Sequence, residues 1–548
     1  MIEISGHIVD VKNQQIFDGI IMVDHGRIYN IKKSHIVEDQ YVMPGFIDSH
    51  VHIESTMLLP ENFAKIAARH GTVGVVADPH EIGNVLGVKG VEFMIESARK
   101  TNFHFCFCAP SCVPATNFET VGHRIDSKDI ALLLQNPEIY GLAEMMNYPG
   151  VIYEDPEVLR KIEHARKMGK PIDGHAPGVT GDDLRKYASH GISTDHECTK
   201  IEDARERLEI GMKIAIRDGS AARNFDSLAP LLNEYSTQLM FCTDDKNPDD
   251  LLEGHIDDAV RRALKAGYPL WNVLNAACLT PIQHYKMPCG LLQKGDSADF
   301  VVIDNLQDVR ILKTYIAGEE YPSHNSNKED EELTSPTEYP NYFNAQPIKP
   351  EDIRVPFQEG KMRVLVATDG SLFTDVEMVE PLAKEGLVLP DVENDVLKLV
   401  VYNRYSFDRP RVAFIRGFGL KDGAIGSSIA HDNHNIIAVG TNDEALAATI
   451  NLLIEMKGGI SVCEHVNGQF SFESLPLPVA GLMSPCEGEI VARQFKKIKA
   501  ATPRLGCSLS EPFMLLSFMA LTVIPRLKLT DKGLFDSVKF EYTELFEK

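Results

Sequence analysis

The chain has 548 residues, of which 44% are hydrophobic and 24% are charged, and its formal net charge is -24. This length exceeds one ordinary domain and allows two or three, one of them large enough to be a barrel. The negative charge argues against a nucleic-acid partner, because proteins that bind phosphate backbones are usually basic on at least one face.

The amino-terminal segment, residues 2–27, alternates apolar and polar side chains as strands do, and lacks the pattern of a signal peptide. The longest apolar stretch, residues 512–525, is too short to cross a bilayer. The ten cysteines form no CxxC pair, and several lie inside apolar strand-like runs, which favours reduced thiols. We therefore expect a cytoplasmic protein with no membrane partner.

Residues 44–284 repeat one pattern, a short apolar run followed by polar residues and then a stretch with helical spacing. Eight such runs occur, at residues 45–52, 71–81, 103–112, 140–147, 170–178, 191–197, 212–220 and 238–245. Segments such as 155–169 between them carry apolar residues at three and four spacing. The pattern predicts an α/β protein with a (β/α)8 barrel. A doubly wound sheet is the alternative, but no glycine-rich phosphate fingerprint follows the first strand.

The flanks of this region predict further domains. Residues 1–43 and 285–322 read as short strands joined by turns, and we expect them to form one small β domain. Residues 323–350 are polar and rich in proline, which is typical of a linker. Residues 351–548 predict a separate α+β domain, with a helix around residues 442–457.

The carboxyl ends of the predicted barrel strands carry residue types that bind metals. The active site of such a barrel lies at these ends, so the residues are expected to converge. The set comprises His50, His52, Glu144, His175, His196 and Asp244. His50 and His52 point to one side of an extended strand because they are two residues apart. Each residue alone has an ordinary structural explanation, but their joint placement favours a metal site.

Six such residues are too many for one catalytic zinc ion, which usually takes three protein ligands and water. They suit two ions bridged by a carboxylate and a hydroxide. The mixture of imidazole and carboxylate is compatible with zinc, iron or manganese.

The motifs in this chain resemble those of the amidohydrolase superfamily and, more closely, the bacterial adenine deaminases. The similarity covers nearly the whole chain and includes PGFIDSHVHIES, ADPHEIGNV, GLAEMMNYPGV, FCTDDKNP and GFGLKDGAIGSSIAHDNHNI. Many superfamily members bridge their metals with a carboxylated lysine on the fourth strand. Here that strand ends in Glu144, which resembles the adenine deaminase pattern of a bridging glutamate.

The resemblance implies hydrolytic deamination of adenine to hypoxanthine and ammonia, with two divalent ions, Mn²⁺ or Fe²⁺ before Zn²⁺. On this resemblance, a hydroxide bridging the ions would attack C6 while Asp244 would accept its proton and pass it to the departing amino group. Glu81 is the first candidate for the acid at N1, and Glu197 is the second. Glu81 is also consistent with a carboxylate stabilised at a helix amino terminus. The resemblance further implies a homo-oligomer.

Other polar residues are candidates for binding the substrate, namely His80, Ser111, Arg217, Ser220, His431 and His434. We expect Arg217 and Ser220 either to hold the purine edge or to brace their loop. Three roles are compatible with His431, Asp432 and His434. They would bind another metal, close over the substrate or form a hydrogen-bonded turn.

Three alternative functions stay open. A cyclic amide hydrolase would use the same metal site, although Glu144 in place of lysine argues against it. A deaminase of another purine or pyrimidine base, or of a nucleoside, would need only a different pocket. A catalytically inactive scaffold should have lost ligands, and every ligand position is filled here.

Overall fold

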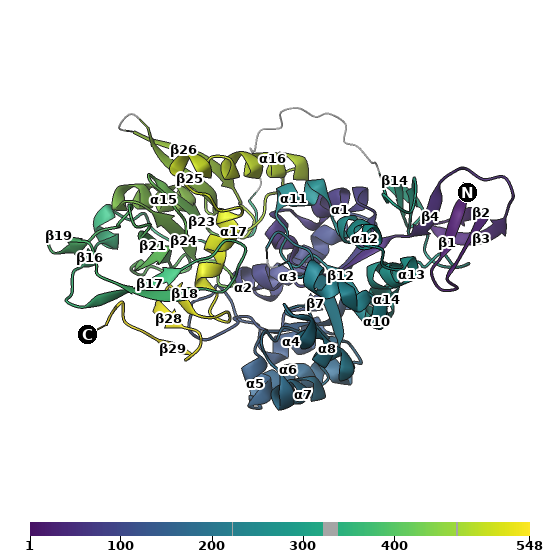
Figure 1. Cartoon of the computed structure of the whole chain (residues 1–548), viewed down its shortest axis with the longest axis horizontal. Helices are drawn as coiled ribbons and strands as arrows, with labels where there is room; N and C mark the ends of the chain where they lie inside the picture. Colours follow the sequence, from purple (N-terminus) through teal and green to yellow (C-terminus); the bar gives the residue numbers. More distant parts are fainter. Residues whose placement is uncertain (222, 322–337, 467–468, 548) are drawn as a thin grey trace. The chain divides into compact units, whose positions relative to one another are not determined.

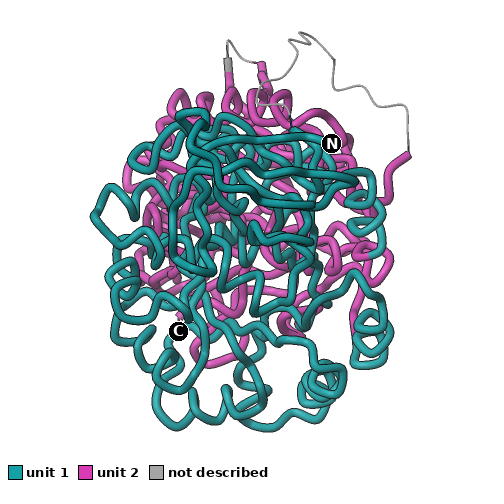
Figure 2. Tube along the Cα trace, turned by 90° about the vertical axis from the view of Figure 1, so that its right-hand side faces the viewer, with its two compact units in different colours: residues 1–79, 92–111, 126–332 teal, residues 80–91, 112–125, 333–548 magenta. Residues whose placement is uncertain are grey.

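The computed structural model describes residues 1–221, 223–321, 338–466 and 469–547 (Figure 1). These residues group into two compact units (Figure 2). Unit 1 contains residues 1–79, 92–111 and 126–332, and unit 2 contains residues 80–91, 112–125 and 333–548. No helix among the described residues is both long and apolar enough to span a bilayer.

Unit 1 is built around eight parallel strands in chain order. They are β5 (Phe46–Val51), β6 (Thr72–Ala77), β7 (His104–Ala109), β8 (Ile139–Met145), β9 (Ile172–Gly174), β10 (Thr194–Asp195), β11 (Lys213–Arg217) and β12 (Leu239–Cys242). The first five form one sheet and the last three another. Strands β9 and β10 are neighbours, as are β12 and β5, which is the order of a (β/α)8 barrel.

Helices follow most of these strands. In unit 1 they are α1 (Pro60–Arg69), α4 (Ser127–Leu133), α5 (Tyr148–Ile152), α6 (Pro156–Lys167), α7 (Gly181–Ser189), α8 (Ile201–Glu209), α9 (Phe225–Leu228), α10 (Leu232–Tyr235), α11 (Pro248–Glu253), α12 (Ile256–Lys265), α13 (Leu270–Leu274) and α14 (Thr280–Tyr285). Local signals define α6 well. The Asp155 side chain accepts hydrogen bonds from the N–H groups of Glu157 and Val158, Pro156 occupies the first turn, and Gly169 follows with a positive φ.

A seven-stranded sheet in unit 1 combines strands from both sides of the barrel sequence. Its strands are β1 (Ile2–Asp10), β2 (Gln15–Asp24), β3 (Arg27–Lys33), β4 (Tyr41–Pro44), β13 (Phe300–Ile303), β14 (Ile311–Ile316) and β15 (Glu319–Tyr321). The order is β15-β14-β13-β4-β1-β2-β3. Strand β4 runs parallel to β1 and antiparallel to β13, so it joins the two flanks. Buried Ile8, Val42 and Phe300 belong to its core.

Unit 2 contains a nine-stranded mixed sheet. Its strands are β17 (Lys361–Val366), β18 (Asp375–Val379), β21 (Leu397–Tyr402), β22 (Arg411–Arg416), β23 (Ala424–Ser427), β24 (Ile436–Gly440), β25 (Gly459–Val466), β26 (Gln469–Pro476) and β30 (Phe546–Glu547). Helix α15 (Asp443–Glu455) packs on β23, β24 and β25, and helix α16 (Gly488–Lys499) packs on β26. The Asn442 side chain caps α15 by accepting a hydrogen bond from the Ala445 N–H at 2.7 Å.

Smaller elements complete unit 2. They are helices α2 (His80–Leu86) and α17 (Pro512–Ser517), and strands β16 (Val355–Pro356), β19 (Ala383–Lys384), β20 (Leu387–Val388), β27 (Leu527–Thr530), β28 (Gly533–Asp536) and β29 (Glu541–Tyr542). Helix α3 (Val88–Ala98) begins in unit 2 and ends in unit 1.

The two units differ from the predicted domains at residues 80–91 and 112–125, which lie inside the predicted barrel sequence but in unit 2. Long-range hydrogen bonds explain this grouping. Asn433 Nδ2 donates to Glu119 Oε2 at 2.6 Å, and Asn435 Nδ2 donates to the Thr120 carbonyl at 3.0 Å. Residue 322 of the predicted small β domain and residues 323–337 of the predicted linker lie outside the described part of the chain. All ten cysteines are free, as the composition predicts.

One buried ion pair in unit 1 yields a stability prediction. Arg207 on α8 donates from Nε to Asp195 Oδ2 at 2.7 Å and from Nη2 to the Ala176 carbonyl at 2.7 Å, and both side chains of the ion pair are buried. Burial raises the pKa of Asp195, but the Arg207 charge outweighs this effect and lowers it. Removing the cation leaves a buried carboxylate unpaired, so Arg207→Leu is expected to lower the free energy of unfolding by about 3–5 kcal/mol.

The check is urea unfolding followed by the fluorescence of Trp271, the single tryptophan, which lies on α13 in unit 1. Arg205→Leu is the matched control on the same helix, because Arg205 and its partner Glu234 are exposed, and we expect a change within about 0.5 kcal/mol. Equal losses in the two variants would contradict the prediction.

Candidate metal centre

The two histidines of the HxH motif lie at the end of β5 and are bound to the end of β12. The Asp244 N–H donates to the His50 carbonyl at 2.9 Å, and the His52 N–H donates to the Asp244 carbonyl at 3.2 Å. Two residues before His50 on the same strand, Asp48 accepts hydrogen bonds from the Thr243 N–H at 3.1 Å and from the Thr243 hydroxyl at 2.5 Å. These bonds fix Asp244 beside both imidazoles.

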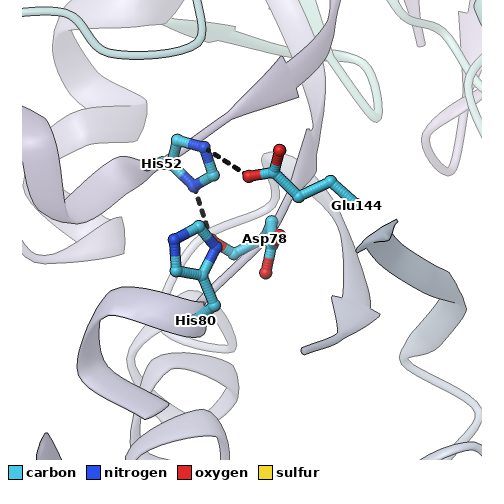
Figure 3. A group of neighbouring side chains, drawn as sticks. All are labelled: His52, Asp78, His80 and Glu144. Atoms are coloured by element: carbon cyan, nitrogen blue, oxygen red, sulfur yellow. Dashed lines mark hydrogen bonds and ion pairs between the residues drawn. The ribbon is translucent and has the colours of Figure 1, made fainter. Parts of the chain in front are cut away.

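Glu144, at the end of β8, lies between two pairs of histidines. Its Oε1 is 3.3 Å from His52 Nε2 (Figure 3) and 3.9 Å from His50 Nε2. Its Oε2 is 2.6 Å from His175 Nδ1 and 3.3 Å from His196 Nε2. The two oxygens therefore face different imidazole pairs.

Asp244 is likewise divided between two sets of neighbours. Its Oδ1 is 3.1 Å from His52 Nε2 and 3.4 Å from His50 Nε2, whereas its Oδ2 accepts a hydrogen bond from Arg217 Nη1 at 2.6 Å. Its φ of 58° lies in the left-handed region, which non-glycine residues rarely adopt and which clusters at functional sites.

The chemistry of this cluster fits metal binding. His50 Nε2 and His175 Nε2 are buried and have no hydrogen-bond partner, as expected of nitrogens that bind a cation. Burial raises the pKa of Glu144, but the charge of His175 and bonds to other histidines lower it well below its usual value. Burial lowers the pKa of His175, yet Glu144 and Glu197 raise it to about 9. The carboxylates thus attract positive charge into this space, and metal ions supply that charge where the imidazoles are neutral.

Three other predicted residues of unit 1 have structural partners. Arg217 Nη1 also bonds to Glu197 Oε1 at 2.5 Å. The Ser220 hydroxyl donates to Asp250 at 2.5 Å and accepts from the Asn247 N–H at 2.8 Å, so it braces the loop after β11. The Ser111 hydroxyl donates to the Glu144 carbonyl at 2.5 Å and supports the end of β8. Their binding of a substrate stays a prediction.

In unit 2, Glu81 forms a buried cluster with His431 and His434. Its Oε1 is 2.5 Å from His431 Nδ1, and its Oε2 is hydrogen-bonded to His434 Nε2. The Ala430 N–H donates to His434 Nδ1 at 3.3 Å, so the His434 proton lies on Nε2. Burial raises the pKa of Glu81, but the charges of His431, His434 and His80 lower it well below its usual value.

Of the three roles expected for residues 431–434, these contacts favour a hydrogen-bonded structure. His80 Nε2 lies 3.5 Å from Glu81 and 3.9 Å from Asp432 Oδ1. The ring of His431 stacks on Phe518 with centroids 4.6 Å apart. The sequence showed no link between Glu81 and His431, because a separation of 350 residues carries no local signal.

Asn224 is a supporting residue that the sequence did not single out. Its Oδ1 accepts the Arg217 N–H at 2.7 Å, and its Nδ2 donates to the carbonyls of His196 at 3.2 Å and Cys198 at 3.0 Å. It therefore fixes the loop of His196 against the end of β11. An asparagine in a loop is too common for its type alone to have predicted this role.

The parallel strands and the buried cluster of histidines and carboxylates at their carboxyl ends are the features of a barrel hydrolase with a candidate metal site. Residues 41–321 match the family model described as "Amidohydrolase family", and residues 371–541 match "Adenine deaminase C-terminal domain". The chain belongs to the adenine deaminases of this superfamily.

Curated relatives are similar over their whole length. The chain is 48% identical to "Adenine deaminase" of Salinibacter ruber over 99% of this chain and 98% of that protein, and 48% identical to "Adenine deaminase" of Methanosarcina mazei over 99% of each. Solved structures include a β-aspartyl dipeptidase from Fervidobacterium islandicum AW-1, with 16% identity, a TM-score of 0.45 and coverage of 60% of this chain and 100% of that one. Another is N-acetyl-D-glucosamine-6-phosphate deacetylase from Mycobacterium smegmatis, with 16% identity, a TM-score of 0.46 and coverage of 58% and 99%.

Proposed function

We propose that this chain catalyses the hydrolytic deamination of adenine to hypoxanthine and ammonia. Full-length similarity to adenine deaminases supports the substrate. The structural observation that carries the chemistry is Glu144, whose two oxygens face two different imidazole pairs. Such a centre suits the addition of water to an electron-poor ring carbon.

Two divalent ions are assigned to this centre. His50, His52 and Asp244 would hold one, His175 and His196 the other, and Glu144 both. When bound, the ions lower the pKa of water so that it attacks at neutral pH, and they stabilise the negative charge that develops. Mn²⁺ or Fe²⁺ is proposed from the resemblance to the family, and Zn²⁺ also suits these ligands.

The chain's own residues then move the protons. Asp244 accepts the proton of the attacking water and gives it to the amino group on C6, which leaves as ammonia. The ring takes a proton at N1, and Glu81 is assigned to this step. Because histidines bind both of its oxygens, Glu81 receives a proton from an imidazole before it passes one on.

The other polar residues expected near the substrate are assigned to the adenine pocket from the family resemblance. His80, Ser111, Arg217, Ser220, His431 and His434 are proposed to shape or support the adenine pocket rather than to hold metal. The protein is further proposed to be a cytoplasmic homo-oligomer, as the family resemblance implies.

The test is ammonia release by protein stripped of metal and reloaded with Mn²⁺ or Fe²⁺. Adenine is expected to be turned over and adenosine, cytosine and dihydroorotate are not, with full activity at two ions per chain. Hydrolysis of dihydroorotate opens the ring without releasing ammonia, so it is followed by formation of the carbamoyl-aspartate product. Turnover of dihydroorotate alone would keep the metal centre and replace the substrate class by cyclic amides. Release of ammonia from adenosine at a rate equal to that from adenine would show that the pocket also accepts ribose.

A further inference from the structure

Arg217 is the last residue of β11 and is buried, with 1% of its surface exposed. A single nitrogen, Nη1, contacts two carboxylates, Asp244 Oδ2 at 2.6 Å and Glu197 Oε1 at 2.5 Å. Its backbone N–H is held by Asn224, which also binds the loop of His196. Hydrogen bonds therefore restrain Arg217 both at its backbone N–H and at its guanidinium group.

This contact makes the two oxygens of Asp244 unequal. Oδ2 is occupied by the hydrogen bond from Arg217 Nη1 at 2.6 Å. Oδ1 points to the opposite side, toward His50 and His52. The orientation of the carboxylate about its Cβ–Cγ bond thus depends on Arg217.

The same nitrogen restrains Glu197. Its Oε1 lies 3.5 Å from His196 Nε2 and 3.8 Å from His175 Nδ1 as well as against Arg217. These contacts, together with the bond from Arg217, hold the Glu197 carboxylate in place beside Asp244.

We propose that Arg217 is a positioning residue that orients the Asp244 carboxylate so that Oδ1 faces His50 and His52. Because its Nη1 is already shared by two carboxylates, this positioning role is proposed in place of contact with the purine edge. This inference rests on the proposed function for its kinetic consequences, but the orientation of Asp244 can be measured without turnover.

The kinetic test compares Arg217→Ala with Arg217→Lys. Loss of the cation frees the Asp244 carboxylate to rotate, and a misplaced catalytic group costs about 100-fold in rate. We expect Arg217→Ala to lose about 100-fold in kcat, with a KM for adenine within about threefold of wild type. Arg217→Lys, whose ammonium supplies a point charge, should recover at least about tenfold of that loss. Added guanidinium chloride should likewise restore kcat in Arg217→Ala but not in wild type.

The second readout is the visible absorption spectrum of protein loaded with Co²⁺, which reports the ligands around the ion. Arg217→Ala should change this spectrum at unchanged cobalt content, and guanidinium should reverse the change. A raised KM with normal kcat would overturn the inference in favour of contact with the purine. An unchanged cobalt spectrum in Arg217→Lys and in Arg217→Ala would also overturn it. If wild type releases no ammonia from adenine, the proposed function fails while the cobalt result still decides the role of Arg217.

Discussion

Asp244→Asn is expected to lower kcat for adenine about 10²- to 10⁴-fold while the fold is retained, which is the range for loss of a positioned general base. Asparagine has nearly the shape of aspartate but cannot accept the proton of water. It also removes the negative charge that faces Arg217 at 2.6 Å. Steady-state ammonia release measures the effect, and circular dichroism checks the fold.

Asp218→Asn is the matched control for this experiment. Asp218 follows β11 directly, but its carboxylate binds Arg262 at 2.7 Å rather than any histidine of the centre. We expect its turnover to stay within about twofold of wild type, as for most substitutions away from a site. Near-normal turnover in Asp244→Asn would remove this residue from the proton transfer, and equal losses in both variants would indicate a general disturbance of the strand ends.

Glu144→Gln is expected to reduce the bound metal from two ions to about one per chain and to lower kcat by at least about 10³-fold. The amide keeps one oxygen but presents an NH₂ group, which is no ligand, to the second imidazole pair. It also removes the anion that attracts cations to the centre. Metal content after dialysis against a fixed concentration of Mn²⁺ measures the first effect directly.

Glu138→Gln controls for the loss of a glutamate from the same part of the chain. Glu138 immediately precedes β8 and pairs with the exposed Arg99. It should retain two ions and normal turnover. Two tightly bound ions in Glu144→Gln would show that Glu144 is not the bridge, whatever the activity of that variant.

Much of the fold was predictable because its signals are local. The eight apolar runs precede polar residues at regular intervals, and each corresponds to an observed strand. The α6 helix is marked by Asp155, Pro156 and Gly169, all within a few residues of its ends. The two-residue spacing of His50 and His52 needs only an extended backbone to predict a shared direction.

The supporting residues of the site could not be predicted in the same way. Arg217 was expected either to hold the purine or to brace its loop, and only the fold shows that it meets Asp244 and Glu197. Glu81 reads as a carboxylate at a helix start until His431 and His434 are placed around it. These roles depend on contacts between distant parts of the chain, for which composition and spacing carry no information.

Residues 80–91 and 112–125 belong to unit 2, although the rest of that unit is made much later on the ribosome. His431 is made 350 residues after Glu81, which at 5–20 residues per second is a delay of roughly 20–70 s. During this interval the carboxylate has no partner from the later segment. A fragment that begins after residue 337 would likewise lack both segments, so the carboxyl-terminal part of the chain is not a self-sufficient module. Residues 80–91, which include α2, and residues 112–125 can therefore complete unit 2 only after the later residues of that unit have been made.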